Sequence, residues 1–133
     1  MKLQSKLPAL GTTIFSQMSQ LAAEHQAINL SQGFPDFQSN PRLIELLAES
    51  ARSGLNQYAP MPGVLLLRQQ ISLLVQRCYQ RNVCPEQQIT VTSGATEALF
   101  VAIQALVRPG DEVIVFDPAY DSYQPAVELA GGF

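Results

Sequence analysis

The sequence predicts an α/β fold, because a strand, a helix and a second strand follow one another within about thirty residues. A β-branched run at residues 88–92 stops at a small turn, and a helical pattern occupies residues 95–107. Residues 112–116 then contain a continuous apolar run, which is typical of a parallel strand covered on both faces. The three elements predict a βαβ unit with a right-handed crossover in a mainly parallel sheet.

The part of the chain before this unit predicts helices separated by polar loops. Threonines at residues 12–13 can cap the first helix, and Asn40 followed by Pro41 marks the start of the second. Gly54 supplies the end of the second helix, and a third is expected from about residue 64 to residue 80. The predicted apolar stripe of this third helix consists of Val64, Leu67, Ile71, Leu74, Val75 and Cys78.

The end of the chain predicts a turn at residues 108–111, the second strand, and a helix over residues 120–130. A parallel sheet needs more than two strands, so a third strand is expected after that helix. The sequence stops at Gly131-Gly132-Phe133. We therefore expect it to be the N-terminal part of a longer protein.

Composition excludes several classes of protein. A chain of 133 residues that is 47% hydrophobic and 14% charged is globular rather than disordered. A net charge of -3 gives no reason to expect a nucleic-acid partner or an anionic membrane surface. The aliphatic run at residues 64–67 is too short to span a bilayer, and no apolar signal core follows the N-terminus. We expect a cytoplasmic protein.

The sequence offers little support for a nucleophilic or metal centre. Cys78 and Cys84 match no zinc or redox spacing. His25 is the single histidine, so neither a Ser-His-Asp triad nor a histidine metal cluster is indicated. The two lysines, Lys2 and Lys6, both precede the first predicted helix.

The small turn at residues 93–96 is the first candidate site. A helix N-terminus presents unpaired N–H groups and a partial positive charge, which together suit a phosphate. The residues Ser-Gly-Ala-Thr allow close approach, and the turn follows a strand, where α/β sheets bind ligands. An ordinary tight turn with a small-residue cap explains the same four residues. Neither the P-loop pattern nor the dinucleotide pattern is present.

Tyr120 is the second candidate, because Pro118 sets the exit of the second strand and places the tyrosine just beyond the sheet edge. Its ring can lie flat on a planar ligand whose phosphate rests at residues 93–96. Alternatively, Tyr120 and Tyr123 are surface-packing or interface residues. A phosphate cradle and an aromatic plate at adjacent strand ends suit a phosphorylated aromatic cofactor.

Four stretches stand out in the sequence: "INLSQGFPDF", "NQYAPMPG", "ITVTSGATEAL" and "PGDEVIVFDPAYDSYQPA". In this order and spacing they resemble the class I aminotransferases, the fold-type I enzymes that use pyridoxal phosphate. The similarity is to the methionine and kynurenine aminotransferase branch. The resemblance implies that Gly94, Ala95 and Thr96 hold the cofactor phosphate and that Tyr120 stacks on the pyridine ring.

The resemblance assigns two further residues. Gly33 is expected near the substrate carboxylate, and Tyr58 is expected to reach across a dimer interface to the phosphate of the neighbouring subunit. Tyr58 can also be read as an aromatic that packs its own loop. Asp117 and Asp121 are interpreted as turn and cap residues rather than catalysts.

The resemblance also predicts domains and an activity. Residues 1–55 are expected to form an N-terminal arm and small-domain segment, and residues 56–133 the start of the cofactor-binding large domain. The parent reaction passes an amino group from a methionine-, aromatic- or kynurenine-like amino acid to a 2-oxo acid, in a homodimer. The family's Schiff-base lysine has no match here, so the chain alone is expected to be inactive. A self-contained α/β phosphate-binding or small-molecule-binding module, or a degraded reading frame, are the alternatives.

We predict that the polypeptide mixed with pyridoxal phosphate shows no Schiff-base absorbance from a lysine at a defined position. The reason is that neither Lys2 nor Lys6 matches the family lysine. Absorbance spectra before and after borohydride reduction, followed by peptide mapping, check this. A band that borohydride removes and that maps to one defined lysine would contradict it.

Overall fold

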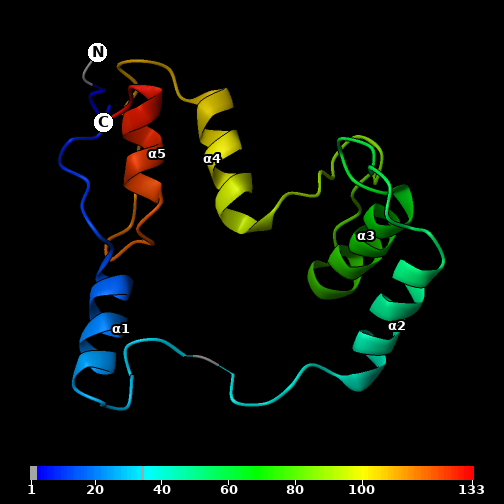
Figure 1. The fold of residues 1–133 in the computed structure, drawn as a ribbon. Coiled ribbons are helices and arrows are strands. Elements are labelled where there is room, and N and C mark those ends of the chain that lie inside the picture. The colour runs from blue at the N-terminus through cyan, green and yellow to red at the C-terminus, as the bar shows by residue number, and fades with distance from the viewer. Residues whose placement is uncertain (1–2, 34) are drawn as a thin grey trace. The chain divides into compact units, whose positions relative to one another are not determined.

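The computed structural model describes residues 3–33 and 35–133, and these residues contain five helices. None of the five is long and apolar enough to cross a membrane. Contacts divide the chain into two compact units, Met1–Asp36 with Ala95–Phe133, and Phe37–Gly94. The helices, labelled in Figure 1, are α1 (Ile14–Glu24), α2 (Pro41–Arg52), α3 (Leu65–Tyr79), α4 (Gly94–Leu106) and α5 (Tyr123–Ala130).

The division by contacts does not fall between residues 55 and 56, where the sequence predicts a domain boundary. The predicted boundary concerns the domains of longer family members. It therefore stays a prediction, and each unit is described by itself below.

Short-range hydrogen bonds start the helices where the sequence predicts. Thr13 Oγ1 accepts from the amide of Ser16, 3.2 Å away, and caps α1. Asn40 Oδ1 accepts from the amide of Arg42 at 2.9 Å, and Pro41 occupies the first turn of α2. Both predicted helix starts are confirmed, because a cap needs only residues that are close in sequence.

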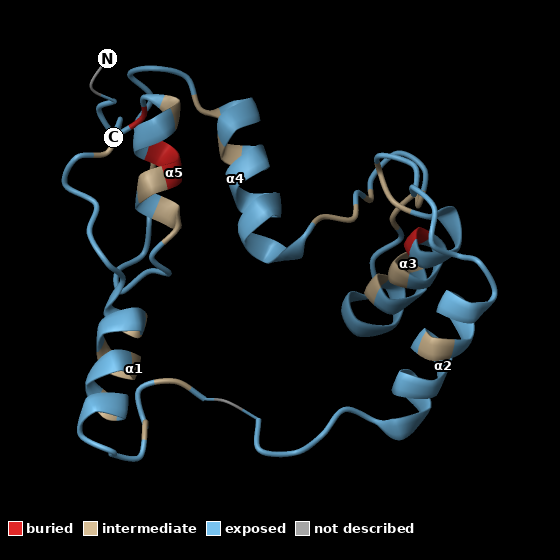
Figure 2. Cartoon of the chain, viewed as in Figure 1, coloured by how far each residue is buried: buried red, intermediate tan, exposed pale blue. Residues whose placement is uncertain are grey.

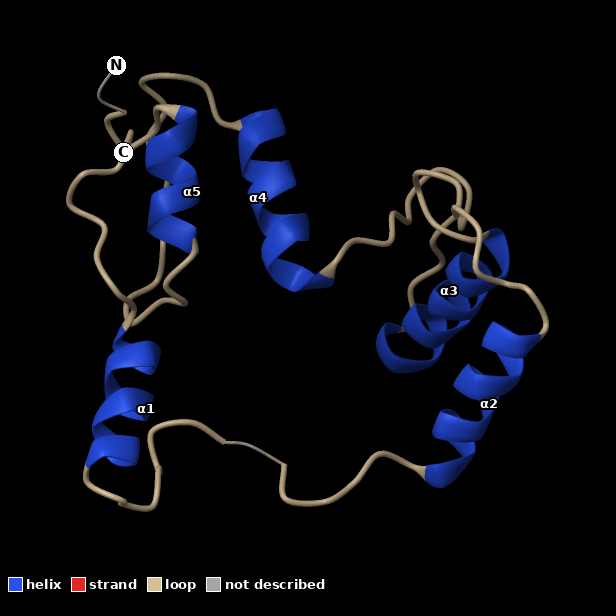
Figure 3. Ribbon diagram, in the orientation of Figure 1, coloured by secondary structure: helices blue, strands red, loops and turns tan. Residues whose placement is uncertain are grey.

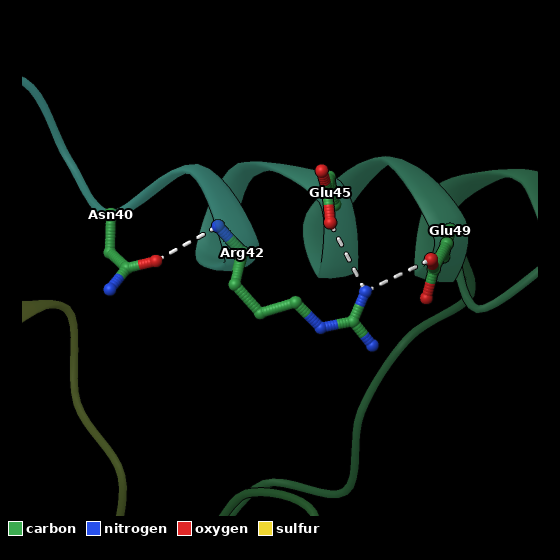
Figure 4. A network of polar contacts seen from close by, with 4 residues as sticks. All are labelled: Asn40, Arg42, Glu45 and Glu49. Atoms are coloured by element: carbon green, nitrogen blue, oxygen red, sulfur yellow. Dashed lines mark hydrogen bonds and ion pairs between the residues drawn. The ribbon is translucent and has the colours of Figure 1, made fainter.

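One face of α2 carries a polar network, drawn in Figure 4. Arg42 Nη1 lies 3.2 Å from Glu45 Oε2 and 3.4 Å from Glu49 Oε1. All three side chains are more than half exposed, so these ion pairs contribute little to stability. Leu43 and Leu47, which are 61% and 71% exposed, leave the apolar part of α2 uncovered as well.

The predicted strands at residues 88–92 and 112–116 are wrong as local assignments. Throughout the described residues the chain forms helices, turns and loops, as Figure 3 shows, and both segments are irregular. A strand exists only when a neighbour pairs with its N–H and C=O groups. In the part of the chain that the structure describes, neither segment forms a run of such bonds with a neighbour.

The second segment nevertheless has the beginning of a parallel pairing. The amide of Phe133 donates to the carbonyl of Asp111 at 3.0 Å, and the amide of Val113 donates to the carbonyl of Phe133 at 2.8 Å. In a parallel pair, the N–H and C=O groups of one residue bond to two different residues of the neighbouring strand, two positions apart. In an antiparallel pair, both groups bond to the same residue. Phe133 follows the parallel pattern. The chain after α5 therefore returns beside residues 111–113 in the same direction.

Alternate side chains of residues 113–117 face α5. Val113, Val115 and Asp117 line a cavity of about 560 Å³ together with Val127 and other residues of α5. The side chains between them point elsewhere, because Ile114 is 91% exposed and Phe116 is 89% exposed. The continuous apolar run predicted two covered faces, but here only the face toward α5 is partly covered, since Val113 is half-buried and Val115 is 39% exposed.

The core of the first unit lies at α5, where Figure 2 shows buried residues. Ala126 and Val127 are buried, and Gln104 of α4 donates to the carbonyl of Ala126 at 2.9 Å. Gly132 is buried beside them. A Cβ at Gly132 would lie 2.8 Å from Val107 Cγ1 and 3.0 Å from Val127 Cγ1.

The predicted apolar stripe of α3 is only partly covered: Ile71 and Val75 are half-buried, and the rest of the stripe is exposed. Val64, Leu67 and Leu74 are 46%, 48% and 58% exposed, whereas Arg68 is only 7% exposed. The face of α3 that the chain covers is centred on Arg68, because the segment after α3 folds back over that face. Periodicity places apolar residues on one face but does not show which face a later segment will cover.

We predict that Gly132→Ala destabilises the chain by about 1–3 kcal/mol, because the added methyl overpacks the contact with two stiff valines. Gly11→Ala is the matched control, since no atom lies within 4 Å of a Cβ built at Gly11. Urea denaturation of both variants measures the difference. Equal unfolding midpoints for the two variants would contradict the packing described here.

Candidate functional site

The turn at residues 92–96 joins the segment after α3 to α4. Gly94 has φ +84°, a left-handed conformation that residues with a side chain rarely adopt. Its amide donates to the carbonyl of Thr92 at 2.9 Å, and Thr92 Oγ1 donates to the carbonyl of Gly94 at 2.9 Å. Two hydrogen bonds and one glycine thus make the sharp turn that the small residues predict.

The turn fits a phosphate in part. Ala95 and Thr96 lie in the first turn of α4, where amides have no carbonyl one helical turn before them. Residues 93–96 are exposed, and no atom lies within 4 Å of a Cβ built at Gly94, so the approach is open. The amide of Gly94 is already bonded to Thr92. The cradle consequently offers the amides of Ala95 and Thr96 and the Thr96 hydroxyl.

Tyr120 lies in an aromatic cluster of the first unit. Its ring centroid is 6.2 Å from that of Phe15, in α1, and 6.0 Å from that of Tyr123, with interplanar angles of 34° and 60°. The ring is about half exposed. It borders a cavity of about 400 Å³ that Asp117 and Asp121 also line.

The described ring contacts of Tyr120 are with Phe15 and Tyr123. The described contacts of the ring therefore fit the surface-packing alternative. The paired role of Tyr120 and residues 94–96 stays a prediction.

The loop that contains Gly33 is tied to α1 by side chains. Ser19 Oγ donates to Gln32 Oε1 at 3.2 Å and accepts from Asn29 Nδ2 at 3.2 Å. Asn29 Oδ1 in turn accepts from the amide of Ser31 at 3.0 Å. Gly33 is exposed at the end of this network, and Phe34 lies outside the described residues.

Tyr58 lies in the loop between α2 and α3, in the second unit. Its side chain is fully exposed, with a relative accessibility of 102%. The interpretation that Tyr58 packs its own loop is therefore wrong. A ring held in solvent remains compatible with a contact to another subunit.

Neither lysine lies near these residues in the sequence. Lys6 is exposed in the N-terminal arm, and Lys2 lies outside the described residues. The described part of the chain also holds no group of three or more His, Cys, Asp or Glu side chains that could bind a metal ion.

Sequence reasoning missed Arg68, the buried charged residue of the second unit. The sequence contains one indication of the buried face. Arg68 and Ser72 lie four residues apart and therefore share a face of α3. Both side chains bond to backbone carbonyls of the segment that follows the helix.

The profile of the class I and II aminotransferases matches residues 25–132, which include every predicted site residue. The chain belongs to this aminotransferase family. The turn at residues 92–96, the Gly33 loop and the exposed Tyr58 are thus parts of an aminotransferase sequence.

Individual aminotransferases agree with this assignment. The chain is 62% identical to the methionine aminotransferase of Escherichia coli over 129 residues, which are 97% of this chain and 33% of that protein. It is 39% identical to the mouse kynurenine–oxoglutarate transaminase 3 over 127 residues, 95% of this chain and 28% of that protein. The chain therefore spans about a third of the length of these relatives.

A solved structure shows the fold. YbdL from Escherichia coli, whose crystal structure and reactivity identify a methionine aminotransferase function, superposes with a TM-score of 0.93 at 61% identity. The match covers 99% of this chain and 35% of that one. The fold is thus of the aminotransferase type, although the described residues form no strand.

We predict that Gly94→Ala destabilises the chain by about 1 kcal/mol, because alanine resists the positive φ of this position. Gly94→Asn is expected to cost less, since asparagine enters the left-handed region more readily. Unfolding midpoints in urea measure both. An alanine variant that is as stable as the asparagine variant would show that the left-handed turn is not formed.

Proposed function

We propose that this chain supplies the phosphate-binding and ring-binding part of a pyridoxal-phosphate aminotransferase. The observation that carries the proposal is the open turn at Gly94, with the first-turn amides of Ala95 and Thr96, in a sequence 62% identical to a methionine aminotransferase. When bound, pyridoxal phosphate supplies an aldehyde for the amino group and an electron-withdrawing ring. The protein's own residues bind and orient it.

Each site residue has a proposed role. The amides of Ala95 and Thr96 and the Thr96 hydroxyl hold the phosphate, and the dipole of α4 favours its negative charge. Gly94 makes the turn that presents these groups. Tyr120 covers one face of the pyridine ring, which its half-exposed ring is free to do after leaving the contact with Phe15.

Gly33 and Tyr58 are proposed to serve the substrate and the second subunit. The hydrogen bonds through Ser19 hold the Gly33 loop, and a residue without a side chain there leaves room for a substrate carboxylate. The exposed ring of Tyr58 extends to the cofactor phosphate of the partner in a homodimer. The substrates are a methionine-, aromatic- or kynurenine-like amino acid and a 2-oxo acid, in the cytoplasm.

The βαβ unit belongs to the same proposal. Residues 111–116 pair with Phe133 in parallel and become a strand when further neighbours are present. The Schiff-base lysine and the groups that bind the substrate carboxylate and the pyridine nitrogen are supplied by polypeptide beyond this chain. The chain by itself then orients the cofactor phosphate without catalysing transamination.

A fusion tests the proposal. We expect this chain, joined to the two thirds of the Escherichia coli methionine aminotransferase that it does not match, to bind pyridoxal phosphate and to transaminate methionine. Within the fusion, Tyr120→Ala should weaken cofactor binding on the order of tenfold, because a stacked ring is lost. Tyr120→Phe is the matched control and should retain binding. Cofactor titration by absorbance and a coupled transamination assay measure both.

Two outcomes would count against the proposal. One is a folded fusion that fails to bind pyridoxal phosphate while the Escherichia coli enzyme binds it under the same conditions. The other is equal cofactor affinity for Tyr120→Ala and Tyr120→Phe, which would remove the role of the ring.

A further inference from the structure

Arg68 is a buried cation whose hydrogen bonds go to backbone carbonyls. Only 7% of the residue is exposed. Its Nε donates to the carbonyl of Gly63 at 3.1 Å, and its Nη1 donates to those of Pro85 and Glu86 at 2.7 and 3.4 Å. The ion pairs among the described residues belong to Arg42. A buried guanidinium is costly unless its N–H groups are paired, so these carbonyls are what stabilise it.

The segment after α3 runs back along the helix and contacts it at successive turns. Ser72 Oγ donates to the carbonyl of Val83 at 2.7 Å, and Arg68 bonds one turn earlier on the helix. The amide of Val91 then donates to the carbonyl of Pro62, just before the helix, at 3.0 Å. Arg68 is thus the middle one of three contacts that hold residues 83–91.

The turn at residues 60–63 lies directly against Val91. The amide of Gly63 donates to the carbonyl of Pro60 at 2.8 Å and closes the turn. A Cβ built at Gly63 would lie 2.6 Å from Val91 Cγ2, so a side chain would force the two segments apart. Arg68 bonds to the carbonyl of that same glycine.

We propose that Arg68 is a positioning residue that holds the turn at residues 60–63 and the segment 85–91 together. It thereby sets the position of Tyr58, a candidate phosphate contact, and of Gly94, which makes the turn that presents the candidate phosphate-binding amides. Tyr58 precedes Pro60 by two residues, and Gly94 follows Val91 by three. The roles of Tyr58 and Gly94 rest on the proposed function, and the contacts of Arg68 do not.

The consequence is a link between two subunits. Gly94 opens the cradle for this subunit's own cofactor phosphate, and Tyr58 reaches the phosphate of the partner. One guanidinium connects the two segments that carry these residues. Movement of either segment therefore changes both contacts.

Arginine is suited to this position by its shape. Its planar guanidinium directs Nε and Nη1 at two segments that are more than twenty residues apart in the sequence. A lysine has one donor atom on a flexible stem and cannot bond to both segments with the same geometry. Arg68→Lys keeps the charge and most of the aliphatic stem but loses the planar set of donors. Its effect therefore reports the loss of the bridge between the two segments rather than the loss of a buried side chain.

Amide hydrogen exchange, measured by NMR without any ligand, tests the bridge. The variants are Arg68→Met, Arg68→Lys and the control Arg77→Met, which changes an exposed arginine of the same helix. We expect exchange at the Val91 amide to accelerate about tenfold in Arg68→Met, because hydrogen bonds from a charged donor are lost. Exchange in α2, which belongs to the same unit, should keep its rate.

Arg68→Lys decides the case if Arg68→Met does not fold. We expect a smaller acceleration that is confined to Gly63 and Val91, with α2 unchanged, and no acceleration in Arg77→Met. Unchanged exchange at Val91 in Arg68→Lys overturns the proposal. Equal acceleration at Val91 and throughout α2 also overturns it, because that result describes a general loss of stability.

A titration with inorganic phosphate, followed through the amide chemical shifts of Ala95 and Thr96, tests the effect on the site. We expect saturable shifts in the wild-type chain and weaker binding in Arg68→Lys than in Arg77→Met. Equal phosphate affinity for these two variants overturns the positioning role. A wild-type chain that does not bind phosphate contradicts the proposed function of the turn, while the exchange rates still decide whether Arg68 forms the bridge.

Discussion

The hydrogen bonds between Phe133 and residues 111–113 are the constraint on which the first unit depends. They bring the chain after α5 back beside the extended segment in the parallel direction, and they place Gly132 against Val107 and Val127. The inner side chains of the segment thereby face α5, and Ala126 and Val127 become buried. The outer face, with Ile114 and Phe116, has no such neighbour. These exposed apolar side chains gain stability when a further layer of structure packs on them.

The second unit also holds a segment against a helix, but it does so without strand pairing. Its segment at residues 83–91, which contains a turn at residues 85–87, is held by polar groups of α3, chiefly the guanidinium of Arg68. Such bonds fix a backbone path with few residues, whereas a hydrophobic core of comparable effect needs many. The path leads directly into the turn at Gly94, so the geometry of the candidate phosphate site depends on a residue some distance away from it in the sequence.

Membership in the aminotransferase family connects these two arrangements with a function. A chain that covers about a third of its relatives carries the turn, the Gly33 loop and the exposed Tyr58. In the function proposed above, those elements bind and orient the cofactor, and the Schiff-base lysine has no match among the residues of this sequence. Apolar residues on α2, on α3 and in residues 112–116 remain exposed.

The sequence by itself determined the features that depend on neighbouring residues. Thr13 and Asn40-Pro41 start their helices, and Gly94 makes the sharp turn, because caps and positive φ angles need only local atoms. The tertiary structure decided which faces are covered and which segments are paired. Val64, Leu67 and Leu74 of the predicted α3 stripe stayed exposed while Arg68 became buried. Within the described part of the chain, residues 88–92 form no strand. Burial and pairing depend on segments distant in sequence, and periodicity does not contain that information.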